Sequence, residues 1–286
     1  GMLPAKPTVT ADKPASMESM KQAYGFVLYR KQFPNGIHGK LELEHAMDYS
    51  IVMANGKTIG TAFVGEGLDS NKLEVNESGP TTLDILVYNL GRISVIVNAS
   101  SPARATKGMQ GATLDGTELT GWESFSLPMT EVTNIQPSNA PQTGPAIYHA
   151  TFSVDHPAGT FLDMRNWGFG AVWVNGHNLG RYWDRGGLRS LFVPAGFMKA
   201  GVNDIAVLEL TEAPKNPEIS GGTAIIQEPA VPWSMKLDRA NLAPTAPGGP
   251  GGFGGPGFPG GRGGRGGRGG APGGGNQPAG QPAAGA

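Results

Sequence analysis

The chain has 286 residues, enough for one large domain or two domains of ordinary size. Its 22 Lys and Arg residues nearly balance 23 Asp and Glu residues, and the resulting net charge of −1 gives no electrostatic case for a nucleic acid partner. The absence of cysteine excludes disulfides, thiolate metal ligands and a cysteine nucleophile. No apolar run reaches the about 18 residues needed to cross a membrane.

The N-terminal residues 1–13 have neither the basic nor the apolar region of a secretion signal. We expect them to be a linker, with Gly1 before Met2 as a cloning remnant. Ser16 is a candidate N-cap for a short helix that would reach Tyr24. The sequence YGFVLYR at residues 24–30 then predicts a strand.

Residues 40–97 have the pattern of strands joined by tight turns. Residues 40–44 alternate apolar and charged side chains, as a half-buried strand does. Residues 48–63 place apolar runs on both sides of Asn55-Gly56, which suits a type I′ turn because both positions need a positive φ. Residues 83–97 are rich in β-branched side chains, which predicts a strand interrupted at residues 89–91. Further on, Asp115-Gly116 predicts another hairpin.

The second half continues in the same manner after a turn-rich loop at residues 134–145. Strands are predicted at residues 150–154, 161–164, 171–174, 191–193 and 204–210. One helical turn is predicted at 194–201, ended by Gly201. Many short strands at close spacing indicate an all-β protein built from sandwiches or jelly rolls.

A short internal repeat divides the β region into two related units. Residues 51–60, IVMANGKTIG, and residues 171–180, AVWVNGHNLG, share an apolar strand, an Asn-Gly pair and a later Gly. We therefore expect a first β-sandwich at residues 14–118 and a second, jelly-roll sandwich at 119–242. From residue 243 the chain is almost entirely Gly, Pro, Ala, Gln and Arg, and residues 243–286 are expected to be a disordered tail.

A series of segments in this order resembles the C-terminal β domains of family 35 glycoside hydrolases, the β-galactosidases. The segments TFLDMRNWGFGAVWVNGHNLGRYW at 160–183 and LRSLFVPAGFMKAGVNDIAVLEL at 188–210 resemble the family's last jelly roll, a galactose-binding-like domain. SMESMKQAYGFVLYR, LDILVYNLGRISV and KGMQGATLDGTELTGWESFSLPM are similar to the preceding β domain. The chain departs from the family pattern at residues 88–92, YNLGR, where the family usually has Glu-Asn before Gly-Arg.

The resemblance implies a non-catalytic accessory region of such an enzyme. The family's chemistry resides in a (β/α)₈ barrel of ~250 residues with two catalytic glutamates, and this chain has no such pattern. The available acids are Glu42, Glu44, Asp48, Glu66, Asp163 and Glu209. Glu42 and Glu44 share one face of a strand, where alternation makes them a solvated pair. We expect no catalytic residue, a barrel domain as partner, a β-galactoside as a contact, and an exported parent enzyme.

Five residues are candidates for carbohydrate binding or a domain interface: Tyr29, Arg30, Arg181, Tyr182 and Trp183. The apolar faces of sugars stack on aromatic rings. Their hydroxyls accept hydrogen bonds from cationic side chains and donate hydrogen bonds to carboxylates. The alternative is that these residues pack inside the sandwiches. The histidines show neither an i,i+4 helical pair nor His-x-His, so we expect no metal site and no cofactor.

The tail contains Arg262, Arg265 and Arg268 within GGRGGRGGRGG. Arg-Gly-Gly repeats occur in RNA-binding segments, which leaves open a second function: a stand-alone β-sandwich scaffold whose tail binds RNA or another anionic partner. Three positive charges contribute little counterion release, so a flexible extension is the simpler interpretation.

Overall fold

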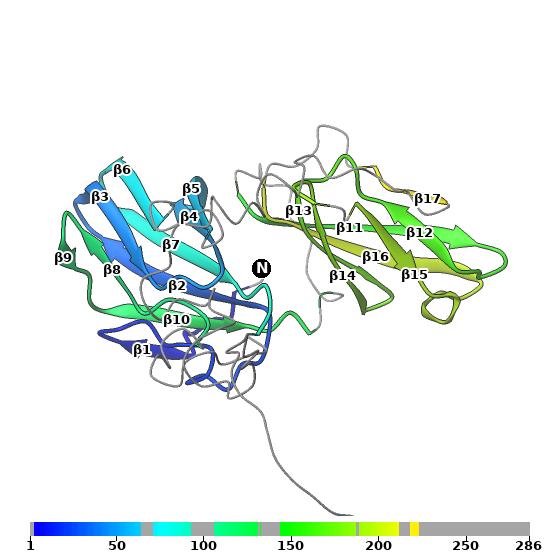
Figure 1. Ribbon diagram of the computed structural model, residues 1–286, viewed down its shortest axis with the longest axis horizontal. Helices are drawn as coiled ribbons and strands as arrows, with labels where there is room; N and C mark the ends of the chain where they lie inside the picture. Colours follow the sequence, from blue (N-terminus) through cyan, green and yellow to red (C-terminus); the bar gives the residue numbers. More distant parts are fainter. Residues whose placement is uncertain are drawn as a thin grey trace, which may run out of the picture. The chain divides into compact units, whose positions relative to one another are not determined.

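The structure is a computed structural model. It describes residues 3–63, 71–92, 106–130, 132, 144–186, 189–211 and 218–222. Within these ranges the chain is all-β, with two sandwiches of antiparallel strands, as predicted (Figure 1).

The first sandwich consists of two facing sheets. The larger sheet contains, in spatial order, β1 (Val9–Ala11), β10 (Trp122–Leu127), β2 (Phe26–Phe33), β7 (Thr81–Tyr88), β4 (Tyr49–Ala54) and β5 (Lys57–Phe63). The smaller sheet contains β6 (Lys72–Ser78), β3 (Gly36–Glu44), β8 (Gly111–Leu114) and β9 (Thr117–Glu118). The core between them includes Tyr29, Leu41, Leu83, Ile85 and Trp122.

The second sandwich has fewer strands among its described residues. One sheet contains, in spatial order, β11 (Ala146–Val154), β16 (Gly201–Glu209), β13 (Phe169–Val174) and β14 (His177–Trp183). The other contains β15 (Ser190–Val193), β12 (Thr160–Asp163) and β17 (Ser220–Gly222), and a 3₁₀ turn at Ala195–Phe197 lies between β15 and β16. The core between the sheets includes Leu162, Trp167, Val172, Tyr182 and Val207.

Both Asn-Gly pairs form the predicted turns. The φ angles are 50° and 82° at Asn55-Gly56, and 48° and 79° at Asn175-Gly176, so both pairs occupy the left-handed region. Each asparagine also ties its turn to the neighbouring strand through its side chain. Asn55 Oδ1 accepts a hydrogen bond from Thr82 N, and Asn175 Oδ1 accepts one from Asp204 N, both at 2.9 Å.

The strand pairings confirm that the two sandwiches are related units. Each of the five described pairings in the second sandwich has a counterpart in the first, with β11 to β17 taking the places of β2 to β8. Both hairpins even shift register at the same point, between Val52 and Met53 and between Val172 and Trp173. The first sandwich has β9, β10 and β1 in addition.

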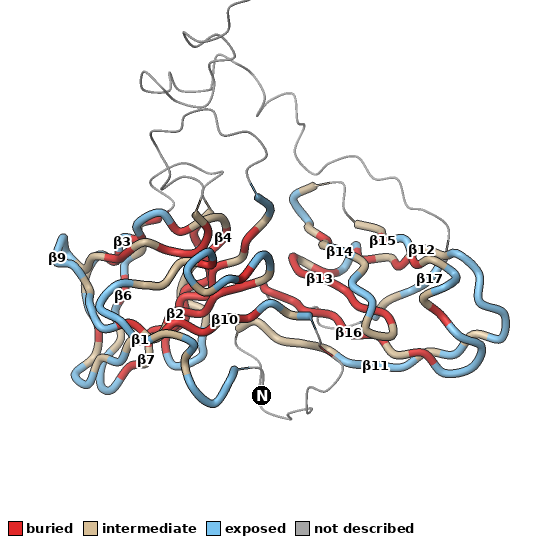
Figure 2. The backbone as a smooth tube through the Cα atoms, turned by 90° about the horizontal axis from the view of Figure 1, so that it is seen from below, coloured by how far each residue is buried: buried red, intermediate tan, exposed pale blue. Residues whose placement is uncertain are grey.

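Two central strands are buried on both faces. Every residue of β4 and of β13 is buried, and Figure 2 shows β13 buried along its length while β11 is mainly intermediate or exposed. A third apolar cluster explains this, because it joins the outer faces of the two larger sheets. It contains Tyr49, Ile51 and Met53 from β4 together with Phe169, Ala171 and Trp173 from β13.

Four expectations need correction. The expected boundary at residues 118/119 falls before β10, which pairs with β2, so we place the end of the first sandwich after Leu127. The helix expected at Ser16–Tyr24 is wrong: the segment forms turns, although Ser16 Oγ does accept a hydrogen bond from Ser19 N at 3.1 Å.

The helical turn expected at residues 194–201 is shorter than predicted. It spans only Ala195–Phe197, and Gly201 begins β16. The predicted strand at 83–97 ends at Tyr88, and residues 93–97 lie outside the described ranges.

Candidate functional site

The side chain of Tyr182 is buried, and that of Trp183 is partly buried. Tyr182 on β14 has an exposed fraction of 0 %, and its hydroxyl donates to Leu208 O at 2.8 Å. Burial, together with the nearby Glu209 carboxylate, raises the pKa of Tyr182. Trp183 stacks on Phe169, with ring centroids 4.4 Å apart. Tyr182 therefore offers no ring face to a sugar, and Trp183 is occupied by protein contacts.

Trp183 belongs to an aromatic contact between the two sandwiches. Its ring meets Phe63 at 5.3 Å, and Phe169 meets Tyr49 at 5.0 Å. In the internal repeat, Phe63 corresponds to Trp183 and Tyr49 to Phe169, since each pair is 120 residues apart. Equivalent residues therefore contact each other, as residues next to the axis of a two-fold interface between identical subunits do.

Arg181 also takes part in the contact between the two sandwiches. Its guanidinium lies 5.8 Å from the ring centroid of Tyr88, and its Nη1 donates to Leu90 O at 3.2 Å. Burial raises the pKa of Tyr88 despite this neighbouring cation. Arg181 thus joins β14 of the second sandwich to the end of β7 in the first.

Tyr29 and Arg30, adjacent on β2, point to opposite faces of the larger sheet. Tyr29 is fully buried; its hydroxyl donates to Ala15 O at 2.8 Å and accepts from Met109 N at 3.0 Å. Arg30 forms two hydrogen bonds of 2.8 Å with the carboxylate of Asp84, its cross-strand neighbour on β7. That bidentate bond raises the pKa of Arg30. Both residues are therefore held by interactions within the first sandwich.

A cluster of four charged residues lies at one end of the first sandwich. Lys107, only 3 % exposed at its side chain, donates to both carboxylate oxygens of Asp48, at 2.6 and 2.7 Å. Asp48 also accepts from Leu90 N at 2.7 Å. Arg92 forms an ion pair with Glu18. The segment that departs from the family pattern thus lies at a structural ionic network.

We expect Glu18 to make stability depend on pH. Burial opposes its ionisation, but hydrogen bonds from backbone N–H groups and from Arg92 outweigh burial and lower the pKa of this carboxyl below 4.5. A lowered folded-state pKa stabilises the protein above the unfolded-state pKa, and that contribution is lost as pH falls through the folded-state pKa. The stability difference between the wild type and Glu18→Gln should therefore be full above about pH 5 and shrink towards about pH 3.

Urea denaturation of both proteins at a series of pH values measures this difference. Glu42→Gln is the matched control because Glu42 is exposed on β3, and its difference from the wild type should be small at every pH. A Glu18→Gln difference that does not change between about pH 5 and about pH 3 would contradict the assignment.

The other described acids among those singled out from the sequence are either solvated or held by neighbours. Glu42 and Glu44 are exposed on β3, as expected for a solvated face. Asp163 accepts hydrogen bonds from Arg165, which lowers the pKa of Asp163. Glu209 accepts from backbone N–H groups of its own sandwich. Glu66 lies outside the described residues.

An aromatic pair, one ring partly buried and the other exposed, lies on the outer face of the smaller sheet of the second sandwich. Phe161 on β12 and Phe192 on β15 are directly opposite each other, with centroids 5.1 Å apart, and Phe192 is 51 % exposed. Asp163, hydrogen-bonded to Arg165, follows on the same face, because residues two apart on a strand share a face. The candidates chosen from the sequence missed this surface, although the apolar residues Phe161 and Phe192 alternate with the buried Leu162 and Leu191.

The described residues contain no cluster of three His, Asp or Glu side chains that could hold a metal ion. The described part of the chain likewise has no helix long and apolar enough to span a membrane. Arg262, Arg265 and Arg268 lie outside the described residues.

Two family models match the chain. The β-galactosidase first all-beta domain matches residues 14–128, ending one residue after β10, and the β-galactosidase galactose-binding domain matches residues 145–203. The second match includes Phe161, Asp163, Arg165 and Phe192.

Known β-galactosidases are similar to the chain over much of its length. One from Xanthomonas manihotis is 35% identical over 191 residues, covering 65% of this chain and 31% of the relative. One from Homo sapiens is 32% identical over 257 residues, covering 79% and 37%. The chain spans about a third of the length of these relatives. The crystal structure of a Pleurotus ostreatus lectin in complex with GalNAc covers 78% of each chain at 14% identity, with a TM-score of 0.26, too low to support an argument.

Proposed function

We propose that this chain, which belongs to the β-galactosidase family through its two β domains, is the non-catalytic accessory region of such an enzyme. In this role it packs against a catalytic barrel domain and contacts β-galactoside carbohydrate. The observation that carries the proposal is the order of the two matched domains, 14–128 and then 145–203. The relatives are about three times as long as the matched part, which leaves room for a catalytic domain.

The shared aromatic contact supports an accessory role for the two sandwiches together. Phe63, Tyr88 and Trp183 pack against the apolar cluster that joins them, which favours a single support over two independent ones. A rigid support can hold a docked domain and a substrate in a constant geometry, whereas two freely jointed sandwiches could not.

The outer face of β12 and β15 is the surface best suited to a galactoside. A galactose ring has an apolar C–H face that stacks on an aromatic ring, and hydroxyls that hydrogen-bond to carboxylate and guanidinium groups. Phe161 and Phe192 supply two adjacent rings, and Asp163 with Arg165 supplies the polar groups. This surface replaces Tyr182 and Trp183 as the proposed carbohydrate contact, because Tyr182 is buried and the ring of Trp183 stacks on Phe169.

Binding of lactose to the full chain, followed by NMR chemical-shift perturbation, tests the carbohydrate contact. We expect weak binding by the wild type and loss of binding in Phe192→Ala. Tyr24→Ala is the matched control, since Tyr24 is also an exposed aromatic residue, at 56 %, but lies in the first sandwich. Equal shifts in wild type and Phe192→Ala, or no shifts at high lactose concentration, would remove this surface from the proposal.

The non-catalytic role has a separate test. A pure preparation of the chain, incubated with nitrophenyl-β-galactoside, should release no nitrophenol above the buffer rate. Retaining glycosidases need two carboxyl groups about 5–5.5 Å apart, whereas Asp48 and Glu209 are engaged by neighbours and Glu42 and Glu44 are exposed. Hydrolysis that co-purifies with the chain through successive columns would overturn the claim.

A further inference from the structure

The sequence contains three Asn-Gly pairs, Asn35-Gly36, Asn55-Gly56 and Asn175-Gly176, and each lies at a turn. This dipeptide is especially prone to spontaneous deamidation, because glycine has no side chain to keep its backbone nitrogen away from the preceding side-chain amide. From the sequence alone the three pairs are equally susceptible, since glycine follows the asparagine in all of them. The structure separates them through the hydrogen bonds that hold each asparagine side chain.

Deamidation begins when the backbone nitrogen of the glycine attacks the side-chain Cγ of the asparagine. The Cγ–Nδ2 bond then breaks, and the side-chain nitrogen leaves as ammonia with the proton that the glycine nitrogen gave up. Water opens the resulting succinimide at either carbonyl, which gives aspartate or, with an extra methylene in the backbone, isoaspartate. Because the attack requires the side chain to turn towards the next backbone nitrogen, hydrogen bonds that hold the amide elsewhere slow the reaction.

The side chain of Asn175 is held by three hydrogen bonds. Its Nδ2 donates to Phe197 O and to Asn203 Oδ1, both at 2.8 Å. Its Oδ1 accepts from Asp204 N at 2.9 Å. Both N–H groups of the amide are therefore used, and the amide cannot turn towards Gly176 without breaking these bonds.

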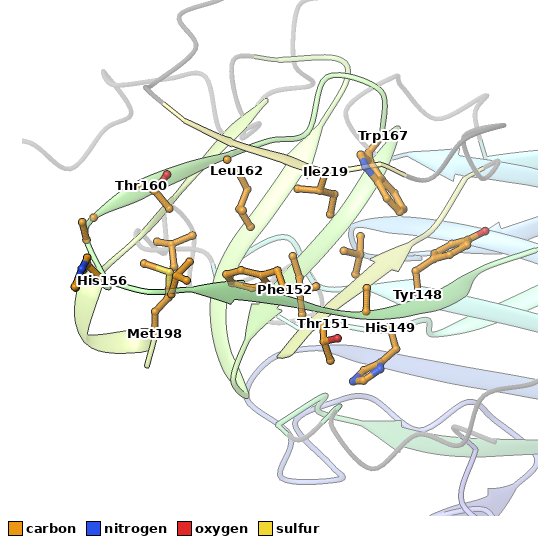
Figure 3. Close-up of a pocket in the computed structure, with 18 residues that line it drawn as sticks. Tyr148, His149, Thr151, Phe152, His156, Thr160, Leu162, Trp167, Met198 and Ile219 are labelled. Carbon is orange, nitrogen blue, oxygen red and sulfur yellow. The ribbon is translucent and has the colours of Figure 1, made fainter. Parts of the chain in front are cut away.

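The acceptors of the Asn175 amide are themselves held in place. Phe197 ends the 3₁₀ turn, and its ring stacks on His177 with centroids 4.3 Å apart. The next residue, Met198, packs in the core of the second sandwich, where Figure 3 shows it among the residues that line an apolar cavity between the sheets. Asn203 is 1 % exposed. Neither acceptor can therefore follow the amide if it moves.

The side chain of Asn55 is held less firmly than that of Asn175, although the two backbones have the same conformation. The φ angles are 50° and 48°, so the backbone does not distinguish the two pairs. Asn55 Oδ1 accepts from Thr82 N at 2.9 Å, but the bond from its Nδ2 to Pro80 O is long, at 3.4 Å. The residue is also exposed. One short hydrogen bond thus restrains Asn55, whereas three restrain Asn175.

Asn35 has the least restrained side chain of the three. It is exposed at the turn between β2 and β3, and among the described residues its side chain has no hydrogen-bond partner. The glycine that follows is required by the fold. Gly36 has a φ of 92°, and a Cβ at this position would lie 2.4 Å from Glu77 O. The susceptible dipeptide is therefore fixed at an exposed turn.

We propose that Asn35-Gly36 is a deamidation site of the folded protein, that Asn55-Gly56 converts more slowly, and that the second sandwich protects Asn175-Gly176. The order follows the hydrogen bonds that must break before each amide can reach the next backbone nitrogen. Conversion of Asn35 places a new carboxylate at the start of β3 and makes the formal net charge of −1 one unit more negative. The aged protein is then a mixture of charge forms.

Ageing of the full chain in mildly alkaline buffer at physiological temperature tests this order. Samples taken over time are digested at acidic pH, and mass spectrometry of the peptides measures the conversion of each asparagine to aspartate or isoaspartate. We expect the initial rate at Asn35 to exceed that at Asn175 by at least about tenfold, with Asn55 between them. Asn35→Gln is the matched control, because glutamine must close a larger ring. It should remove the early conversion at this position and leave the other two rates unchanged.

Two further measurements show whether the fold sets the order. In guanidinium the three pairs should convert at similar rates, since glycine follows each asparagine and the hydrogen bonds are lost. In the folded chain, Asn203→Ala removes one acceptor from Asn175 and should speed conversion there by about fivefold or more, with the rate at Asn35 unchanged in the same sample. If Asn203→Ala does not fold, the comparison of folded and unfolded wild type still decides the proposal.

Three results would overturn the proposal. One is a conversion rate at Asn175 equal to or above that at Asn35 in the folded chain. Another is the same set of rate differences in guanidinium, which would assign them to the sequence and not to the hydrogen bonds. The third is an unchanged rate at Asn175 in a folded Asn203→Ala protein.

Discussion

Replacing Phe169 by Ala should cost about 3–5 kcal/mol of unfolding free energy, the usual range for removing a fully buried aromatic side chain. Phe169 on β13 stacks on Trp183 at 4.4 Å, meets Tyr49 at 5.0 Å and Tyr88 at 5.7 Å. It lies in the cluster shared by the two sandwiches. Its loss should therefore weaken the contact between them as well as the packing beneath β13.

Guanidinium denaturation followed by circular dichroism measures this loss, and a second transition would report sandwiches that unfold separately. Phe192→Ala is the matched control: the same side chain is removed from an exposed position, and the cost should stay within about 1 kcal/mol. Equal losses in the two variants would contradict the assignment of Phe169 to a shared core.

Replacing Glu209 by Ala should cost at least about 3 kcal/mol, because it leaves several buried donors without an acceptor. Glu209 is 1 % exposed. Its carboxylate accepts hydrogen bonds from Gly168 N at 2.9 Å, Phe169 N at 3.1 Å and Thr211 N at 2.8 Å. These bonds tie the beginning of β13 to the end of β16, so their loss should loosen the middle of the larger sheet.

Glu209→Gln should fall between the wild type and Glu209→Ala, since an amide keeps one oxygen acceptor but replaces the other with a donor. The unfolding midpoint of each variant in a thermal scan is the measurement. Glu42→Ala removes an exposed glutamate from β3 and should change stability by no more than about 0.5 kcal/mol. A Glu209→Ala protein as stable as Glu42→Ala would show that the carboxylate is dispensable.

Local features were predictable from the sequence because their causes are local. The Asn55-Gly56 and Asn175-Gly176 turns follow from the tolerance of these residues for positive φ, and both occur. The alternation at residues 40–44 predicted a half-buried strand, and β3 buries Leu41 and Leu43 while exposing Glu42 and Glu44. The repeat at a spacing of 120 residues predicted two related sandwiches, which the matching strand pairings confirm.

The candidate site residues were not predictable in the same way. Alternation predicts that neighbouring strand residues face opposite sides, but not which side another sheet covers. Arg181 and Trp183 would face solvent in an isolated sandwich, and they are occupied here because the first sandwich packs against β14. Phe161 and Phe192, on a face that no described sheet covers, became candidates only once the layers were known.

The sequence by itself therefore determined the all-β class, the hairpins, the internal repeat and the family resemblance, since each depends on residues close together in the chain. The tertiary structure decided the end of the first sandwich after β10, the burial of Tyr29 and Tyr182, and the aromatic contact that joins the sandwiches. Those features depend on pairings and face-to-face packing between segments far apart in sequence. The free energy of burial is set by which surfaces meet, and no single segment carries that information.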